Sequence, residues 1–137
     1  MVYFIQEGNS GPIKIGQTFG SPLDRLTQLQ TGNPRELHLL GVMHGHCGDE
    51  EEIHRQFAGV HLRGEWFQPT QELLAFISDN CLSRQQFDKA WSNLQAKGYK
   101  SNHFLWQAWD CGYIRICGEH REYEYGASDS KVAEGGT

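Results

Sequence analysis

Three polar residues in the first half of the chain have the types that chemistry on a phosphate ester requires, namely Arg25, Glu50 and His54. The carboxylate of Glu50 is a hard oxygen ligand that suits Mg²⁺ or Mn²⁺, and such an ion keeps most of its waters. The guanidinium of Arg25 can direct two hydrogen bonds onto a phosphate and stabilise charge that builds up in a transition state. His54 can contact the phosphate or the leaving group, or can act as a structural hydrogen-bond donor.

Tyr3 and Lys14 are the candidates for activating a water molecule. A tyrosine with an ordinary pKa near 10 is ionised to only about one part in a thousand at pH 7, so it needs help to act as a base. Lys14 can give part of that help by favouring the phenolate, with a metal-bound water supplying the rest. Alternatively, Lys14 orients the nucleophile and Tyr3 only hydrogen-bonds it. The sequence leaves both alternatives open.

A β-hairpin would position these two residues. The apolar runs Val2–Ile5 and Ile13–Ile15 are separated by turn-forming residues between positions 7 and 12. If the hairpin closes symmetrically, Tyr3 lies directly opposite Lys14 on one face of the sheet. The opposite face then belongs to the core, and we expect it to carry Val2, Phe4, Ile13 and Ile15.

Helices would position the other candidates. Ser21 and Pro22 predict the start of a helix that contains Arg25 and runs to about residue 30, where Gly32 and Pro34 stop it. An apolar stretch over residues 37–43 predicts a third strand. A second helix is expected over residues 49–57. Helical periodicity places one set of its residues inward, toward Arg25 and the core: Glu50, Ile53, His54 and Phe57.

The second half of the chain has a different character. An apolar helix is predicted to begin at Thr70, and a capping box at Ser83 and Gln86 predicts an amphipathic helix that ends at Gly98. Residues 113–117 alternate like a strand. We therefore divide the chain into a domain over residues 1–77, a helix plus strand-like appendage of unknown role over 78–125, and a disordered tail over 126–137.

The composition narrows the function classes. A net charge of -5 argues against broad electrostatic adhesion to nucleic acid, so any such contact must be local or assisted by a metal or a partner. No apolar run is long enough to span a bilayer, and no basic leader precedes Val2, so we expect a cytoplasmic protein without membrane contact. The four cysteines have no CxxC spacing and are expected to be free thiols: Cys47, Cys81, Cys111 and Cys117.

The order of the motifs is informative. The series comprises Val2–Ile5, then Lys14-Ile15-Gly16, the helix with Arg25, Glu50 with His54, and Gly64-Glu65-Trp66-Phe67. Together it resembles the GIY-YIG nuclease domain over residues 2 to about 77, in particular the branch found in phage reading frames and fungal meiotic genes. The resemblance implies an α/β (α+β) fold, in which a small three-stranded antiparallel sheet is flanked by helices. It also implies a metal-dependent endonuclease that hydrolyses phosphodiester bonds of nucleic acid with Mg²⁺ or Mn²⁺. We expect DNA as the substrate more than RNA, a choice that the sequence leaves open.

The resemblance also assigns roles to residues. Tyr3 takes the position of the tyrosine of the first motif, Lys14 opens the second motif, Arg25 is the helix arginine, and Glu50 is the metal-binding glutamate. Two departures concern the general base: the second motif usually opens with a tyrosine, and the asparagine that some members carry after the metal glutamate has no counterpart here.

Several other interpretations remain open. The chain can be a non-catalytic nucleic-acid-binding or adaptor module on the same scaffold, and residues 78–125 can form a homodimer or bind a protein partner. Glu65 and Trp66 can close the site or pack the sheet edge, and packing is preferred for Trp66 and Phe67. A zinc site at residues 44–47 or 117–120 is disfavoured because neither segment has a complete four-ligand spacing.

Overall fold

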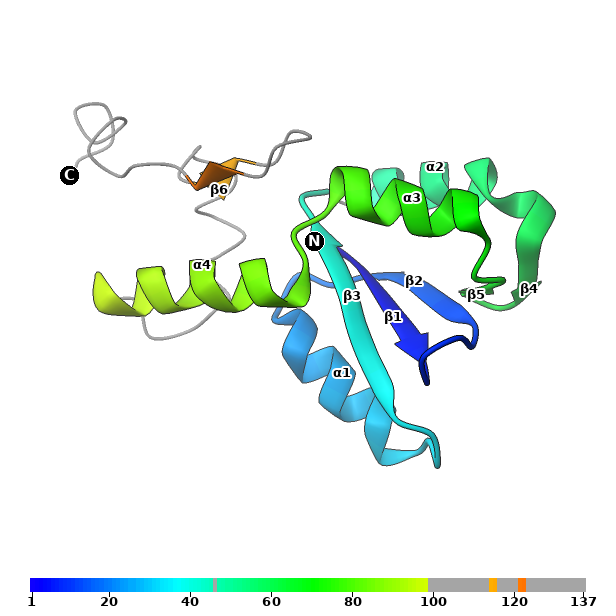
Figure 1. Cartoon of the computed structure of the whole chain (residues 1–137), viewed down its shortest axis with the longest axis horizontal. Helices are drawn as coiled ribbons and strands as arrows, with labels where there is room; N and C mark the ends of the chain where they lie inside the picture. Colours follow the sequence, from blue (N-terminus) through cyan, green and yellow to red (C-terminus); the bar gives the residue numbers. More distant parts are fainter. Residues whose placement is uncertain (46, 99–113, 116–120, 123–137) are drawn as a thin grey trace.

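The chain folds around a five-stranded antiparallel sheet in the order β3-β1-β2-β5-β4. This computed structural model describes residues 1–45, 47–98, 114–115 and 121–122 (Figure 1). The strands of the sheet are β1 (Val2–Glu7), β2 (Ile13–Gln17), β3 (Leu37–Met43), β4 (His61–Arg63) and β5 (Trp66–Phe67). The α+β class is confirmed. The expectation of three strands is wrong, because β4 and β5 extend the sheet beyond β2.

Helices cover both faces of this sheet (Figure 1). They are α1 (Pro22–Thr31), α2 (Cys47–Gln56), the 3₁₀ turn η1 (Ala58–Val60), α3 (Gln71–Asn80) and α4 (Arg84–Ala96). One core cluster joins Tyr3 and Ile5 of the sheet to α1 and α4, and the other joins Val2 and Phe4 to α2 and α3. The central strand β1 is therefore buried on both sides, as its continuous apolar run requires.

The helix starts follow the sequence signals. The Ser21 hydroxyl accepts a hydrogen bond from the Leu23 N–H at 3.1 Å, and Thr70 caps α3 through Leu73 N–H at 3.2 Å. The capping box at Ser83 and Gln86 is present in both directions at the start of α4. This last helix shares the main core, because Phe87, Ala90 and Leu94 are buried against the sheet. The short strand β6 (Ile114–Arg115) pairs with β7 (Arg121–Glu122) inside the predicted strand-like region. The predicted tail over 126–137 lies outside the described residues.

The hairpin of β1 and β2 closes two residues away from the predicted register. Tyr3 pairs with Gly16, and Lys14 pairs with Ile5, so the predicted pairing of Tyr3 with Lys14 is wrong. The turn is longer than a symmetric two-residue loop: Glu7 N–H donates to Pro12 C=O at 3.0 Å and Gly11 N–H donates to Glu7 C=O at 2.9 Å. A shift of two residues preserves which face each side chain occupies. The predicted core face is therefore confirmed, and Tyr3 and Lys14 are diagonal neighbours on the other face.

Gly16 makes room for Tyr3. Tyr3 is 1% exposed, and a Cβ at position 16 would collide with its hydroxyl and its ring. The tyrosine side chain therefore lies across β2 at the one residue without a side chain, and the requirement for glycine here is one of space.

We expect Gly16→Ala to lower the free energy of unfolding by about 1–3 kcal/mol, since the added methyl group overpacks a buried site. Urea denaturation of the full chain measures this loss. Gly59→Ala is the matched control, because a Cβ at Gly59 meets nothing within 4 Å; its stability should stay within about 0.5 kcal/mol of the parent. Equal losses in the two variants would contradict the close packing of Tyr3 on Gly16.

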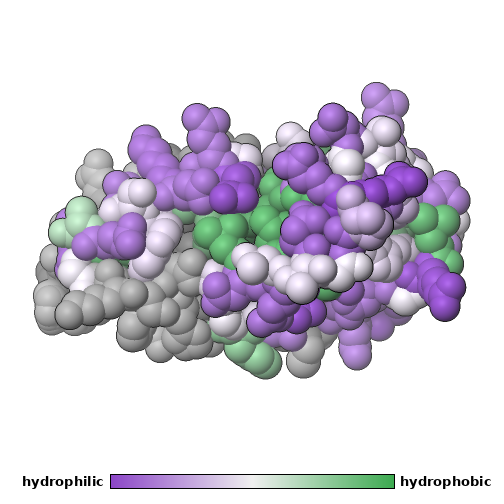
Figure 2. Space-filling model, turned by 90° about the horizontal axis from the view of Figure 1, so that it is seen from below, coloured by the Kyte–Doolittle hydropathy of each residue, from purple (hydrophilic) through white to green (hydrophobic). Residues whose placement is uncertain are grey.

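The surface is mostly polar on the face shown in Figure 2, where hydrophobic side chains gather in a central patch and a smaller one toward one end. Among the described residues, no helix is long and apolar enough to cross a membrane.

Candidate functional site

The candidate site forms where β5 ends and the edge of β2 is left without a strand partner. β5 pairs with β2 at Ile13 and Lys14, and the last ladder bond runs from Ile15 N–H to Glu65 C=O at 2.9 Å. Beyond that bond, His54 of α2 takes over: its Nε2 lies 2.9 Å from the Ile15 carbonyl oxygen and must donate to it. The short strand β5 thus leaves a stretch of the β2 edge without a strand partner. We call this stretch and the polar side chains beside it the notch.

Glu50 lies one helical turn before His54 and faces the same notch. Its carboxylate oxygen is 3.7 Å from His54 Nε2, and its side chain is 15% exposed. The predicted helix phase is confirmed, since Ile53 and Phe57 are buried and the adjacent Glu51 and Glu52 are exposed. His54 also packs its ring against Phe67 at 4.9 Å between centroids.

Lys14 and Glu65 complete the notch from the strand side. Lys14 Nζ lies 2.8 Å from the Glu65 carboxylate, with the lysine side chain only 13% exposed, and 5.8 Å from the centre of the Trp66 ring. The carboxyl groups of Glu65 and Glu50 also interact with each other, because Glu65 is among the groups that raise the pKa of Glu50. Four side chains from β2, α2 and the β4–β5 turn therefore meet in one place: Lys14, Glu50, His54 and Glu65.

The pKa of Glu50 is raised above its ordinary value. Burial is the largest cause, because it removes water from the charged form, and the negative charge and hydrogen bond of Glu65 raise the pKa further. The positive charges of His54 and Lys14 act in the opposite direction. Ionising Glu50 beside Glu65 therefore costs free energy. A cation placed between the two carboxylates would lower that cost.

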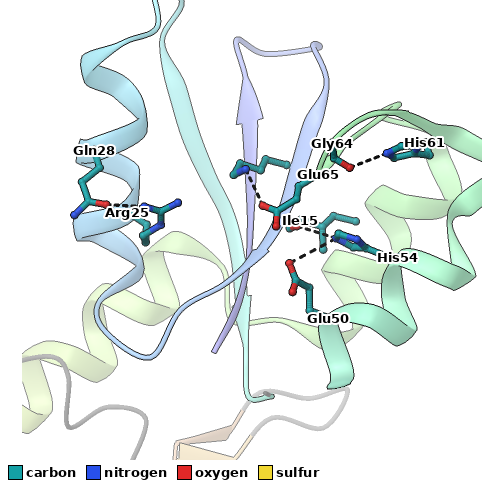
Figure 3. A network of polar contacts seen from close by, with 9 residues as sticks. Ile15, Arg25, Gln28, Glu50, His54, His61, Gly64 and Glu65 are labelled. Carbon is teal, nitrogen blue, oxygen red and sulfur yellow. Dashed lines mark hydrogen bonds and ion pairs between the residues drawn. The ribbon is translucent and has the colours of Figure 1, made fainter. Parts of the chain in front are cut away.

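Arg25 approaches from the opposite helix. It projects from α1, and its Nη1 donates to Gln28 Oε1 of the same helix at 2.6 Å. Figure 3 shows Arg25 on α1 and Glu50 on α2 on either side of the strands, with Glu65 between them. The acidic pair and the lysine therefore lie together at the edge of β2, and Arg25 lies across the strands from them in Figure 3.

The first part of the chain matches a known protein family. The model of the T5orf172 domain matches residues 1–84. The chain belongs to the T5orf172 domain family. No curated protein and no solved structure matches it. The T5orf172 domain is related to the GIY-YIG/HNH-like nuclease-associated fold, and it indicates a nuclease-like or nucleic-acid-associated module.

The five residues predicted for the site take different places in this T5orf172 domain. Lys14, Glu50 and His54 lie together at the notch, whereas Arg25 lies on α1, across the strands from Glu50 in Figure 3. Tyr3 is the exception, because it is buried in the core between the sheet and α1, with its hydroxyl over Gly16.

Glu65 is the residue whose place in the site the sequence left undecided. It was expected either to close the site or to pack the sheet edge, and its contacts with Lys14 and Glu50 place it in the notch. Its two neighbours pack as expected: Phe67 is buried and Trp66 is half-buried. The available signal was the Gly64-Glu65 turn before an apolar pair, which predicts a polar side chain at a strand end.

The donor set of the T5orf172 notch suits a hard divalent cation. Glu50 and Glu65 offer two neighbouring carboxylates, and Mg²⁺ is typically bound by one or two carboxylates with water filling its other positions. Among the described residues, no group of three or more His, Cys, Asp or Glu side chains is arranged to hold a metal ion, so the two carboxylates would share such an ion with water.

The carboxyl pair makes a prediction about ionisation. Glu65→Gln should lower the pKa of Glu50 toward its ordinary value, since the variant removes a negative charge and can donate a hydrogen bond to the Glu50 carboxylate. NMR titration of the side-chain carboxyl carbons measures the shift. Glu52→Gln is the control, because Glu52 is exposed and pairs with Arg55 at 2.6 Å; an equal shift there would mean that the pair is not the cause.

Proposed function

We propose that this T5orf172 domain is a metal-dependent endonuclease that hydrolyses phosphodiester bonds of nucleic acid, DNA rather than RNA. The observation that carries the proposal is the meeting of Glu50, Glu65 and Lys14 at the open edge of β2, with Arg25 on α1, across the strands from Glu50 in Figure 3. Mg²⁺ or Mn²⁺ would be held by Glu50, and Glu65 can contribute a second oxygen. When bound, the ion would lower the pKa of a water and polarise a phosphate oxygen.

The protein's own groups divide the remaining work. Arg25 can fork onto the phosphate and neutralise charge as it develops, since the described structure ties its guanidinium only to an exposed glutamine of its own helix. Lys14 is held by Glu65 with its ammonium in a half-enclosed position, where it can orient an attacking water.

The geometry bears differently on the two alternatives for activating water, in which either Tyr3 acts as the base with help from Lys14 or Lys14 orients the nucleophile. Because Tyr3 pairs with Gly16 and not with Lys14, a lysine directly opposite the phenol is not available to favour the phenolate. We therefore favour Lys14, with Glu65, as the group that orients the nucleophile, and give Tyr3 a supporting role under the strand. His54 holds α2 against β2, because its Nε2 proton is used by the Ile15 carbonyl and its ring packs on Phe67, and it thereby positions the helix that carries Glu50.

The test is incubation of the full chain with labelled single-stranded and double-stranded DNA and RNA in Mg²⁺, in Mn²⁺ and in EDTA. Cleavage that disappears both in EDTA and in Glu50→Gln supports the proposal. Binding with no cleavage in either metal would instead favour a non-catalytic adaptor, a role for which the acidic net charge of -5 leaves room if binding is local.

A further inference from the structure

The aromatic ring of Phe19 is exposed to solvent. Among the described residues, three large hydrophobic side chains are exposed, and Phe19 is the most exposed at 63%, ahead of Leu62 at 46% and Leu74 at 40%. Leaving a phenyl ring in water forgoes the free energy that its burial would supply. A single exposed ring is common on protein surfaces, so it is the position of Phe19 in the fold that makes it of interest.

The backbone around Phe19 is fixed on both sides. Thr18 N–H donates to Met1 C=O at 2.9 Å, and the Met1 amino group donates to Thr18 C=O at 2.8 Å. Gly20 N–H donates to Thr18 Oγ1 at 3.0 Å, and the buried Ser21 then caps α1. Hydrogen bonds therefore fix the backbone that carries the Phe19 ring, and this reduces the conformational entropy lost when the ring binds a partner.

This connection joins the elements that carry the site. It follows β2, which bears Lys14, and leads into α1, which bears Arg25. It also lies at the end of the sheet where α2 begins, since Gln17 pairs with Val2, and Gly45, just before α2, lies against the Val2 side chain. Phe19 thus lies on the connection between the strand that carries Lys14 and the helix that carries Arg25, at the end of the sheet where α2 begins.

The acidic net charge of the chain limits how it can bind nucleic acid. With a net charge of -5, the chain cannot hold a polyanion by many Lys and Arg contacts. Stacking of a base on an aromatic ring adds affinity that does not depend on neutralising phosphates. It needs a base whose face is accessible, which an intact duplex does not offer except at its ends.

We propose that Phe19 stacks on an unpaired base next to the phosphate bound in the notch, so that the preferred substrate is single-stranded or locally unpaired nucleic acid. The inference rests on the proposed action on nucleic acid. It adds a specificity: Arg25 and Lys14 recognise the backbone, and Phe19 recognises the absence of a pairing partner.

Fluorescence anisotropy of the full chain with a labelled DNA single strand and with the corresponding duplex, in EDTA to prevent metal-dependent cleavage, tests the proposal. Phe19→Ala should weaken binding of the single strand by about fivefold to a hundredfold and that of the duplex by less than about twofold. Phe19→Trp should retain the parent's affinity, and Leu62→Ala, which removes an exposed apolar side chain on β4, should be without effect. An RNA strand of the same sequence forms a parallel arm.

A second measurement locates the base. An abasic position moved along the single strand should weaken binding to the parent at one place, and Phe19→Ala should be insensitive at that same place, because the two changes remove one contact. Three results would overturn the proposal: additive losses of affinity from Phe19→Ala and the abasic position, equal losses for Phe19→Ala on single strand and duplex, or no loss of affinity for Phe19→Ala. The third result, together with a protein ligand that Phe19→Ala fails to bind, would assign the ring to a protein partner. The assay measures binding alone, so it separates the two proposals. A chain that cleaves nothing but needs Phe19 to bind the single strand would refute the nuclease proposal and leave the stacking intact. A chain that cleaves nucleic acid but binds it equally well without Phe19 would refute the stacking and leave the nuclease proposal intact.

Discussion

The Glu50→Gln variant is expected to lose metal-dependent cleavage by roughly a thousandfold or more, while its free energy of unfolding at pH 7 rises. Glutamine keeps the shape of the carboxylic acid and can hydrogen-bond Glu65, but it cannot give a metal the charged oxygen that it needs. The loss of activity and the gain in stability have one cause, which is that the folded chain holds an ionised carboxylate against burial and a second carboxylate.

The gain in stability should depend on pH in a definite direction. Because the pKa of Glu50 is raised in the folded state, its protonated form is the stabilising one. That contribution is present below the pKa of the unfolded chain and is lost as the pH rises through the higher pKa of the folded chain. Urea denaturation of parent and variant should therefore give similar stabilities in acid, and a growing advantage for Glu50→Gln toward neutral pH.

Glu51→Gln is the matched control for both measurements, since Glu51 is the next residue of α2 and points to solvent. It makes the same change in net charge and should leave cleavage and stability close to those of the parent. Cleavage by Glu50→Gln at the parent's rate would rule out Glu50 as the metal ligand. Reduced stability at neutral pH would show that the charged form is favoured by the fold.

Features set by local chemistry could be predicted from the sequence. The caps at Ser21 and Ser83 need only a side chain and a backbone N–H a few residues away, so the helix starts follow directly. The orientation of Glu50 follows from the 3.6-residue period of a helix anchored by Ile53 and Phe57. The alternation of strand side chains likewise fixed the core face of the hairpin, although it could not fix the register.

Features set by contacts between distant residues could not be predicted in this way. The turn of the hairpin is held in part by Gly8, whose φ is 64° and whose N–H donates at 2.7 Å to the carbonyl of Glu36, a residue far along the chain. Alternation with a period of two is equally satisfied by registers that differ by two residues. The strands β4 and β5 have three and two residues, too few to show a pattern, and the place of Glu65 depends on them.

Arg25→Ala should slow cleavage by roughly a hundredfold to a thousandfold, the usual loss when one group that stabilises transition-state charge is removed. Its free energy of unfolding should remain within about 0.5 kcal/mol of the parent's, because the hydrogen bond of its guanidinium goes to the exposed side chain of Gln28. Single-turnover cleavage rates measured beside urea denaturation separate the two effects.

Two further variants show why the arginine is needed. Arg25→Lys keeps the positive charge and loses the planar pair of donors, so it should recover only part of the lost rate. Arg55→Ala removes an arginine that is 68% exposed on α2 and bound to Glu52, and it changes the net charge by the same amount. If Arg55→Ala slowed cleavage as much, the effect of Arg25 would be one of overall charge; full recovery in Arg25→Lys would reduce its role to that of a point charge. Partial recovery in Arg25→Lys, together with unchanged cleavage by Arg55→Ala, would assign the effect to the planar pair of donors of Arg25, which a phosphate in the transition state can accept from.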